Sequence, residues 1–263
     1  ADNRYPDVIG SVSATTKSGI SYISKIQGFF PNVQVFENKD LIRSDTFVFC
    51  SIDDIVGEHV WIDHFSKEMN ETSVDALKKA KRIFSPSRNN ALQIQKATGK
   101  EVSVMTKPMP ICGPIEVKHF KKYCLMLDRH PATTKSIIEA WNDTLPPLAL
   151  MGARGSYPPH VIPINEYVDY KRMLFILKSA QCLIDVRSGN TDYLSGWCSL
   201  ADSYGVPVVT NGWGSLTNEN AVMLPSSYNH ESIIGCVTEA CSGRGNPNSL
   251  PPFETSVKNL LTF

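Results

Sequence analysis

The chain has 263 residues, 42% of them hydrophobic and 20% charged, an ordinary composition for a globular protein with one large or two small domains. Its 26 basic and 26 acidic side chains balance. This balance argues against a general electrostatic surface for nucleic acid or anionic membranes, so we expect no strong nucleic-acid signature. No apolar run is long enough to cross a bilayer, and we expect no membrane span.

The start of the chain and the cysteines bear on the compartment. The opening segment ADNRYPDVIG has neither the basic nor the apolar region of a signal peptide, so we expect none. Seven cysteines, an odd number without a Cys-x-x-Cys motif, favour free thiols over a disulfide framework. They are Cys50, Cys112, Cys124, Cys182, Cys198, Cys236 and Cys241. We therefore expect a cytoplasmic protein.

In the first part of the chain, apolar runs of strand length alternate with helical patterns. We expect strands at 7–12, 32–36, 46–51, 59–63 and 101–108, and helices at 16–30, at 71–84 and just before Gly99. The segment KPMPICGPIEV, residues 107–117, holds three prolines and a glycine, which is typical of a connector. We place a domain boundary there.

The second part alternates more regularly. We expect strands at 123–128, 147–152, 160–164, 181–186, 206–210 and 221–225, and helices at 133–143, 168–180, 192–204 and 229–241. Apolar strands separated by helices indicate parallel strands buried on both faces. The predicted fold class is α/β, with two Rossmann-like domains facing across a cleft. Their ranges are 1–110 and 111–250, and a tail helix at 251–263 can pack on either.

Ligands of open parallel sheets bind beyond the carboxyl ends of the strands, so the loops after the strands are searched first. The first such loop of the second domain, DRHPATTK, places Arg129 and Lys135 on either side of a helix start. Helix N-termini favour anions, and diphosphate binding is the specific interpretation. The alternative is that Arg129 and Lys135 are simply two solvated cations near the start of a helix.

Three further loops of this domain are candidates. GARGSYPP contributes Gly152 and Arg154, but it lacks a third glycine and continues into Pro158-Pro159, which excludes a nicotinamide-type fingerprint and leaves a plain turn as an alternative. The loop DVRSGNTDY offers possible phosphate donors at Ser188, Gly189, Asn190 and Thr191. The loop NGWGSLTNENA carries Glu219. Long polar loops at this edge are often functional.

The segments LDRH followed by Lys135, PLALMG, SAQCLIDVR and ADSYGVPVVTNGWG together resemble the C-terminal half of GT-B glycosyltransferases. The retaining, glycogen-synthase-like enzymes are the most similar, and the phage DNA-base glucosyltransferases are similar to a lesser degree. The resemblance implies that Arg129 and Lys135 hold the donor diphosphate. It also implies that Gly205 to Val209 form the turn that ends the donor site. Small enzymes of this kind are familiar from viruses and phages, so the resemblance suggests a viral or phage type. A viral protein of this type would be located in the cytoplasm of its host.

The family pattern has two glutamates eight positions apart, and the second binds the donor ribose. Asp192 and Leu200 stand at the corresponding positions, and Asp192 can replace the first carboxylate, whereas Leu200 cannot hydrogen-bond a ribose. The first domain resembles this family only in the layout of its elements.

In the first domain, the loop SATTKSG is small and contains glycine, as acceptor-side loops of this fold tend to be, and we assign Thr15, Thr16 and Gly19 to it. Asp63 and His64 follow a strand and are candidate catalytic residues. In an inverting enzyme either can take the acceptor proton, and in a retaining one a His contacts the donor sugar. Alternatively, Asp63 caps the next segment and His64 is an ordinary loop histidine.

We expect no metal, because no Asp-x-Asp occurs and the six histidines lack ligand spacing. The predicted function is transfer of a sugar from a nucleotide-sugar donor, such as a UDP- or GDP-sugar, to an unidentified acceptor, without a cofactor. The alternatives are a non-catalytic binding protein of the same fold and a sugar-nucleotide 2-epimerase. Whether the chain forms a homodimer stays open.

Overall fold

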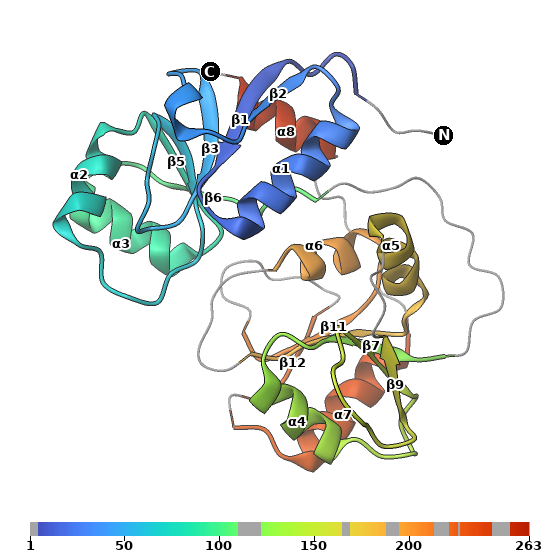
Figure 1. The fold of residues 1–263 in the computed structure, drawn as a ribbon. Helices are drawn as coiled ribbons and strands as arrows, with labels where there is room; N and C mark the ends of the chain where they lie inside the picture. The colour runs from blue at the N-terminus through green and yellow to red at the C-terminus, as the bar shows by residue number, and fades with distance from the viewer. Residues whose placement is uncertain are drawn as a thin grey trace. The chain divides into compact units, whose positions relative to one another are not determined.

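The computed structural model describes residues 5–109, 122–164, 169–187, 195–212, 221–225, 227–243 and 253–262. The chain divides into two compact units, Ala1–Pro110 together with Pro251–Phe263, and Ile111–Leu250. Each unit holds a six-stranded sheet, and all strand pairs described are parallel. Helices flank both sheets (Figure 1). The expected α/β fold with two parallel sheets is confirmed.

The first unit has the sheet order β2-β1-β3-β4-β5-β6. Its strands are β1 (Gly10–Ala14), β2 (Val33–Phe36), β3 (Thr46–Cys50), β4 (His59–Ile62), β5 (Arg82–Ser85) and β6 (Ser103–Val104). Its helices are α1 (Lys17–Phe29), the 3-10 turn η1 (Lys39–Leu41), α2 (Glu71–Lys79), α3 (Arg88–Thr98) and α8 (Phe253–Leu261). The chain leaves β1 toward β2 and then crosses to β3, so the strand order reverses between β1 and β3.

Alternating side chains of these strands build a separate core on each face of the sheet. Phe47 and Phe49 of β3 pack with α1 and α8, whereas Val48 and Cys50 pack with α2 and α3. This alternation follows from the two-residue period of a strand. The sheet is therefore buried on both faces, as its continuous apolar runs predict.

The expected helix over 71–84 is wrong in its second half. α2 ends at Lys79, Ala80 has extended backbone, and β5 begins at Arg82. Ile83 and Phe84 are buried in the sheet next to β4. Their burial between neighbouring strands outweighs the helical propensity of the preceding lysine-rich segment.

The second unit has the sheet order β12-β11-β10-β7-β8-β9. Its strands are β7 (Cys124–Leu127), β8 (Leu148–Met151), β9 (Val161–Ile164), β10 (Leu183–Asp185), β11 (Val208–Thr210) and β12 (Ala221–Met223). Its helices are α4 (Pro131–Ala140), α5 (Tyr170–Ser179), α6 (Gly196–Ser203) and α7 (His230–Cys241). Counted from β7, this is the strand order of a doubly wound Rossmann sheet, which reverses between β7 and β10.

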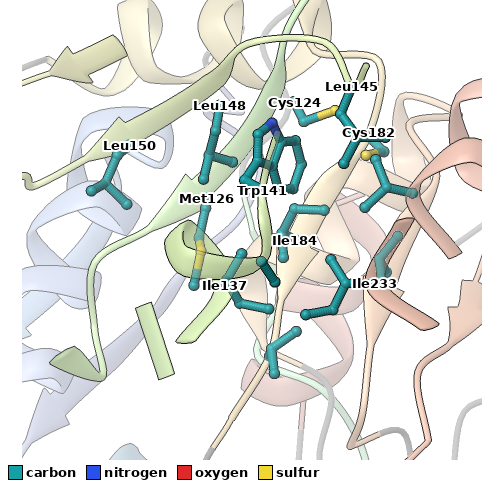
Figure 2. Close-up of a cluster of buried hydrophobic side chains, with 14 of the residues drawn as sticks. Cys124, Met126, Ile137, Trp141, Leu145, Leu148, Leu150, Cys182, Ile184 and Ile233 are labelled. Atoms are coloured by element: carbon teal, nitrogen blue, oxygen red, sulfur yellow. The ribbon is translucent and has the colours of Figure 1, made fainter. Parts of the chain in front are cut away.

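One face of this second sheet packs against α4 and α7, and α5 and α6 lie on the other face (Figure 1). Trp141 and Ile137, from α4 and its end, lie over Met126, Leu148 and other strand residues in the core shown in Figure 2. No helix in the described ranges is long and apolar enough to cross a membrane.

Candidate functional site

The reversal of strand order in the second sheet defines a crevice at the carboxyl ends of β7 and β10. These two strands are direct neighbours, with Leu183 and Ile184 paired to Leu125 and Met126. Their following segments diverge, because the chain continues from β7 toward β8 and from β10 toward β11. Open α/β sheets bind their ligands at such reversals.

A small pocket of about 50 Å³ lies at this reversal. It is lined from the β7 side by Leu127, Arg129 and His130, and from the β10 side by residues 184–187. Pockets for drug-sized ligands occupy roughly 300 Å³ or more. The pocket therefore has room for a small group and forms only part of a larger ligand site.

The helix that follows β7 begins without a side-chain cap. His130 is the N-cap of α4 and makes no capping hydrogen bond, and Pro131 occupies the first turn. The N-caps of α1, α2, α3, α5, α6 and α7 all accept a hydrogen bond through their side chains. The start of α4 thus presents backbone N–H groups and the positive end of a helix dipole beside the pocket.

The two predicted diphosphate ligands lie in different surroundings. Arg129 is exposed and lines the pocket, and its backbone N–H donates to the carbonyl of Leu127 at 2.9 Å. Lys135 lies one turn into α4, its side chain is 77% exposed, and its ammonium is 3.7 Å from the carboxylate of Glu139. Lys135 does not line the pocket.

Two buried oxygens near this edge lack a hydrogen-bond partner among the described residues. They are Oδ1 of Asp128, directly after β7, and Oγ1 of Thr134 in α4. A buried polar atom without a partner costs free energy, so native proteins usually satisfy it with water or a ligand. These atoms add polar groups to the carboxyl end of β7.

A buried ion pair closes the β10 side of the pocket. The Nη2 and Nε atoms of Arg187 donate to Oδ2 of Asp185 at 2.9 and 3.2 Å. Asn211 fixes the backbone of Arg187 on both sides, because its side chain accepts from the N–H at 2.9 Å and donates to the carbonyl at 2.7 Å. This pair is not among the residues predicted from the sequence, although Asp-x-Arg at the end of an apolar strand is a visible signal.

Asp185 also receives hydrogen bonds from the start of α6. Cys198 donates through Sγ to Oδ2 at 3.0 Å, and Ser195, the N-cap of α6, lies 3.5 Å from the same oxygen. Burial, and then the charge of Asp185, raises the pKa of the Cys198 thiol. The thiol therefore stays protonated as a donor, and Asp185 positions Arg187 and α6 rather than serving as a free base.

The remaining predicted donor-side residues divide into two groups. Ser188, Gly189, Asn190, Thr191, Asp192 and Glu219 lie outside the described residues. Gly152 and Arg154 belong to the turn after β8, in which Gly152 has a positive φ of 82° and the hydroxyl of Tyr157 bridges the N–H and carbonyl of Arg154. Leu200, at the position of the second family glutamate, is only 1% exposed within α6.

The loop predicted to face the acceptor lies at the reversal between β1 and β3 of the first unit, and its residues make structural contacts. The hydroxyl of Thr15 donates to the carbonyl of Asp54 at 2.9 Å. Thr16 caps α1 by accepting from the N–H of Gly19 at 3.0 Å. A Cβ atom on Gly19 would lie 2.8 Å from the Cβ of Ala14, so only glycine fits against β1.

Asp63 and His64 follow β4 at the same edge of the first sheet. The N–H of Asp63 donates to the Cys50 carbonyl, and its carboxylate accepts from the N–H of His64, both at 2.9 Å. A larger hollow of about 550 Å³ begins at Ser66, and neither Asp63 nor His64 lines it.

Lys107 is a further candidate; it lies where the predicted strand 101–108 and the predicted connector 107–117 overlap. Its ammonium lies 4.8 Å from the ring centroid of Trp61 and 5.1 Å from that of Tyr22. Burial lowers the pKa of Lys107, and the negative charge of Asp63 opposes this shift. The tertiary structure thus brings a cation to Asp63, a proximity that the sequence separation of the two residues does not reveal.

Comparison with known proteins places this geometry in a recognisable fold. No protein-family model matches the chain, and no curated protein matches it significantly in sequence. Among solved structures, an alpha-glucosyltransferase in complex with UDP and a 13-mer DNA containing a HMU base matches with a TM-score of 0.51. The match covers 97% of this chain and 95% of that chain at 10% identity.

The apo form of the lipopolysaccharide outer core galactosyltransferase WaaB matches with a TM-score of 0.50. It covers 95% of this chain and 94% of that one at 12% identity. The chain has the GT-B fold. At these identities the likeness establishes the fold alone, and function depends on the residues at the site.

Proposed function

We propose that the chain is a glycosyltransferase that binds the diphosphate of a nucleotide-sugar donor at the carboxyl edge of its second sheet. One observation carries the proposal: a GT-B chain has, at the reversal between β7 and β10, an uncapped helix start beside Arg129 and a small pocket. Backbone N–H groups, a helix dipole and an arginine together form a site for phosphate oxygens.

The departing nucleoside diphosphate gains negative charge as the glycosidic bond breaks. Arg129 and the N-terminus of α4 would stabilise this charge without a metal ion, as preorganised donors do in other enzymes. The ion pair of Asp185 with Arg187, held by Asn211, would keep the opposite wall of the pocket rigid. Lys135 does not line the pocket and is 77% exposed, so its expected share is smaller than that of Arg129.

Further residues of the second unit would contact the phosphates, the sugar and the nucleotide of the donor in this proposal. The loop with Ser188, Gly189, Asn190, Thr191 and Asp192 would donate to the phosphates and the sugar. Gly152, Arg154 and Glu219 would border the nucleotide. The resemblance to retaining, glycogen-synthase-like enzymes and to those of phages remains part of this proposal.

The first unit would receive the acceptor near Thr15, Thr16 and Gly19. In an inverting enzyme, Asp63 or His64 would take the acceptor proton, and Lys107 places a positive charge near Asp63. In a retaining enzyme, His64, whose backbone N–H donates to the carboxylate of Asp63, would instead contact the donor sugar.

The test is a thermal-shift series with nucleoside diphosphates and their sugars, each with and without magnesium. A ligand at a hundred times its Kd stabilises the folded chain by about 2.7 kcal/mol. We expect a magnesium-independent rise for one nucleotide. Arg129→Ala should bind that nucleotide at least tenfold more weakly, and so show a clearly smaller rise at the same concentration, since a hydrogen bond to a charged group contributes roughly 1.5–3 kcal/mol. Arg88→Ala, an exposed arginine of α3, is the matched control and should respond like the wild type.

No response of the wild type to any nucleoside diphosphate, or an unchanged response in Arg129→Ala, would refute the donor site. The buried Leu200 favours one alternative, a binding protein of the same fold that has lost the ribose contact. Slow release of free sugar from the donor without acceptor separates the two functions, because only an enzyme breaks the glycosidic bond.

A further inference from the structure

Three cysteines that are far apart in the sequence converge at the amino edge of the second sheet, opposite the edge described above. Cys124 begins β7, Cys182 directly precedes β10, and Cys241 ends α7. Their three Sγ atoms all lie within 4.8 Å of one another. The Sγ of Cys241 is 3.6 Å from that of Cys124 and 3.9 Å from that of Cys182.

Neighbouring backbone contacts hold two of these sulfurs in place. The N–H of Leu125 donates to the carbonyl of Cys182 at 2.9 Å, and the N–H of Gln181 donates to the carbonyl of Tyr123 at 2.8 Å. Cys124 and Cys182 are therefore fixed by the pairing of adjacent chain segments. Figure 2 shows both at one end of the apolar core that also contains Leu145.

The separations of the sulfurs match those of thiolates around one metal ion. With zinc–sulfur bonds of about 2.3 Å, two thiolates lie roughly 3.8 Å apart in tetrahedral geometry and about 4.0 Å apart in a trigonal arrangement. Two cysteines joined in a disulfide have sulfurs only about 2.05 Å apart. The separations of 3.6 and 3.9 Å from the Sγ of Cys241 match these values, and the third pair of sulfurs lies within 4.8 Å, close enough for all three to approach one ion.

Access from the surface also suits an ion. Cys124 and Cys182 are fully buried, whereas Cys241 is half-buried, so an ion can enter from the side of α7 and keep water as a further ligand. Zinc sites with three protein ligands have this open position.

We propose that Cys124, Cys182 and Cys241 form a binding site for a single thiophilic ion of the zinc class. The bound ion would fasten the end of α7 to the first residues of β7 and β10. Binding to the folded chain would stabilise the second unit, because the three thiolates converge only in the folded state. The site lies at the other end of β7 from the donor pocket, so the two proposals stand independently.

The test is titration of the reduced, metal-free full chain with cobalt(II), which gives an ultraviolet charge-transfer band when thiolates bind it. We expect saturation at one equivalent in the wild type, displacement of cobalt by zinc, and a higher melting temperature with zinc. Cys241→Ser should lose the band and the zinc-induced shift. Cys236→Ser is the matched control, because Cys236 is also half-buried in α7 but its Sγ faces the carbonyl of Met223 at 3.6 Å.

Two results would overturn the proposal: a wild type without a charge-transfer band, or a Cys241→Ser variant that retains the full band. Equal melting temperatures of metal-free wild type and Cys241→Ser would establish that the variant is folded. A loss of the band in Cys236→Ser together with its retention in Cys241→Ser would place the ion elsewhere and would equally refute the triad.

Discussion

Asp185 and Arg187 form an ion pair that is almost entirely buried, with 9% and 4% of each residue exposed. Removing one partner leaves the other charge in an apolar surrounding, which costs about 3–5 kcal/mol. We therefore expect Arg187→Met to lower the free energy of unfolding by roughly 3 kcal/mol. This value is at the low end of the range because Cys198 and Ser195 still donate to Asp185 in the variant. Urea unfolding of the full chain measures this.

The control for this pair is the double variant Asp185→Asn with Arg187→Met, which removes both charges at once. If the two side chains act as a pair, the double variant should cost less than the sum of the single ones, with a coupling of about 1–3 kcal/mol. Strictly additive costs would contradict the proposed pairing.

Cys50 gives the first unit a defined response to alkaline pH. Burial raises the pKa of its thiol from 9.0 to about 12. The folded state thus holds this proton more tightly than the unfolded state, so the stabilisation is complete below pH 9 and is lost as the pH rises toward 12. Each pH unit in this window removes about 1.4 kcal/mol.

We expect the advantage of the wild type over Cys50→Ala to shrink by about 1.4 kcal/mol between about pH 8 and about pH 10. Urea unfolding of both chains, followed by circular dichroism, measures the difference and cancels groups common to both. A constant difference across this range would show that the Cys50 thiol ionises as easily in the folded chain as in the unfolded one.

Among the elements, the strength of the sequence pattern decided what could be predicted. α3 and its end at Gly99 were predictable, because a glycine with a φ of 72° terminates the helix as C-cap glycines do. β5 was not, since four residues next to a lysine-rich helix carry no period of their own. Only their pairing with β4 and β6 identifies them as a strand.

Helix α1 contains two glycines in opposite surroundings, which provides a test of its packing. A Cβ at Gly19 would lie 2.8 Å from the Cβ of Ala14, whereas a Cβ at Gly28 would meet no atom within 4 Å. We expect Gly19→Ala to destabilise the chain by about 1–3 kcal/mol through a forced shift of α1. Gly28→Ala should stabilise it by roughly 0.5–1 kcal/mol through helix propensity.

The melting temperatures of the Gly19→Ala and Gly28→Ala variants measure these opposite changes in stability. Destabilisation of equal size by the two would indicate that α1 does not approach β1 as closely as the structure places it. The same comparison bears on the loop between β1 and α1, the proposed acceptor side, because Thr16 and Gly19 set the position of this loop.

At the level of the whole molecule, the sequence revealed the two parallel sheets and the loop with Arg129, because both depend on local patterns and on the rule for strand ends. It did not reveal the ion pair, the contact of Lys107 with Trp61, or the convergence of three cysteines. These depend on which strands and helices become neighbours. A change of strand order would separate Cys124 from Cys182 without altering a single local pattern.

The chain also returns to its first unit after completing the second, and α8 makes this return part of the first core. Val257, Leu260 and Leu261 are buried with residues of β1 and α1. The guanidinium of Arg82 donates to the carbonyls of Asn259 and Thr262 at 2.8 and 2.9 Å. Burying three such side chains contributes about 5–9 kcal/mol, which approaches the whole stability of an ordinary domain.

We therefore expect a chain that ends before Pro251 to lose hydrogen-exchange protection in β1 and β3 while β7 and β10 keep theirs.

A milder pair of variants tests the same contact. Leu260→Ala should lower the free energy of unfolding by about 2–5 kcal/mol. Asn259→Ala, a change at the exposed neighbour, should leave it almost unchanged, because the backbone carbonyl of residue 259 still accepts from Arg82. If β1 were as well protected in the truncated chain as in the full chain, α8 would lie on the surface of the first unit without being needed for its core. A loss confined to that unit would establish that its core is completed only when the last helix of the chain has folded onto it.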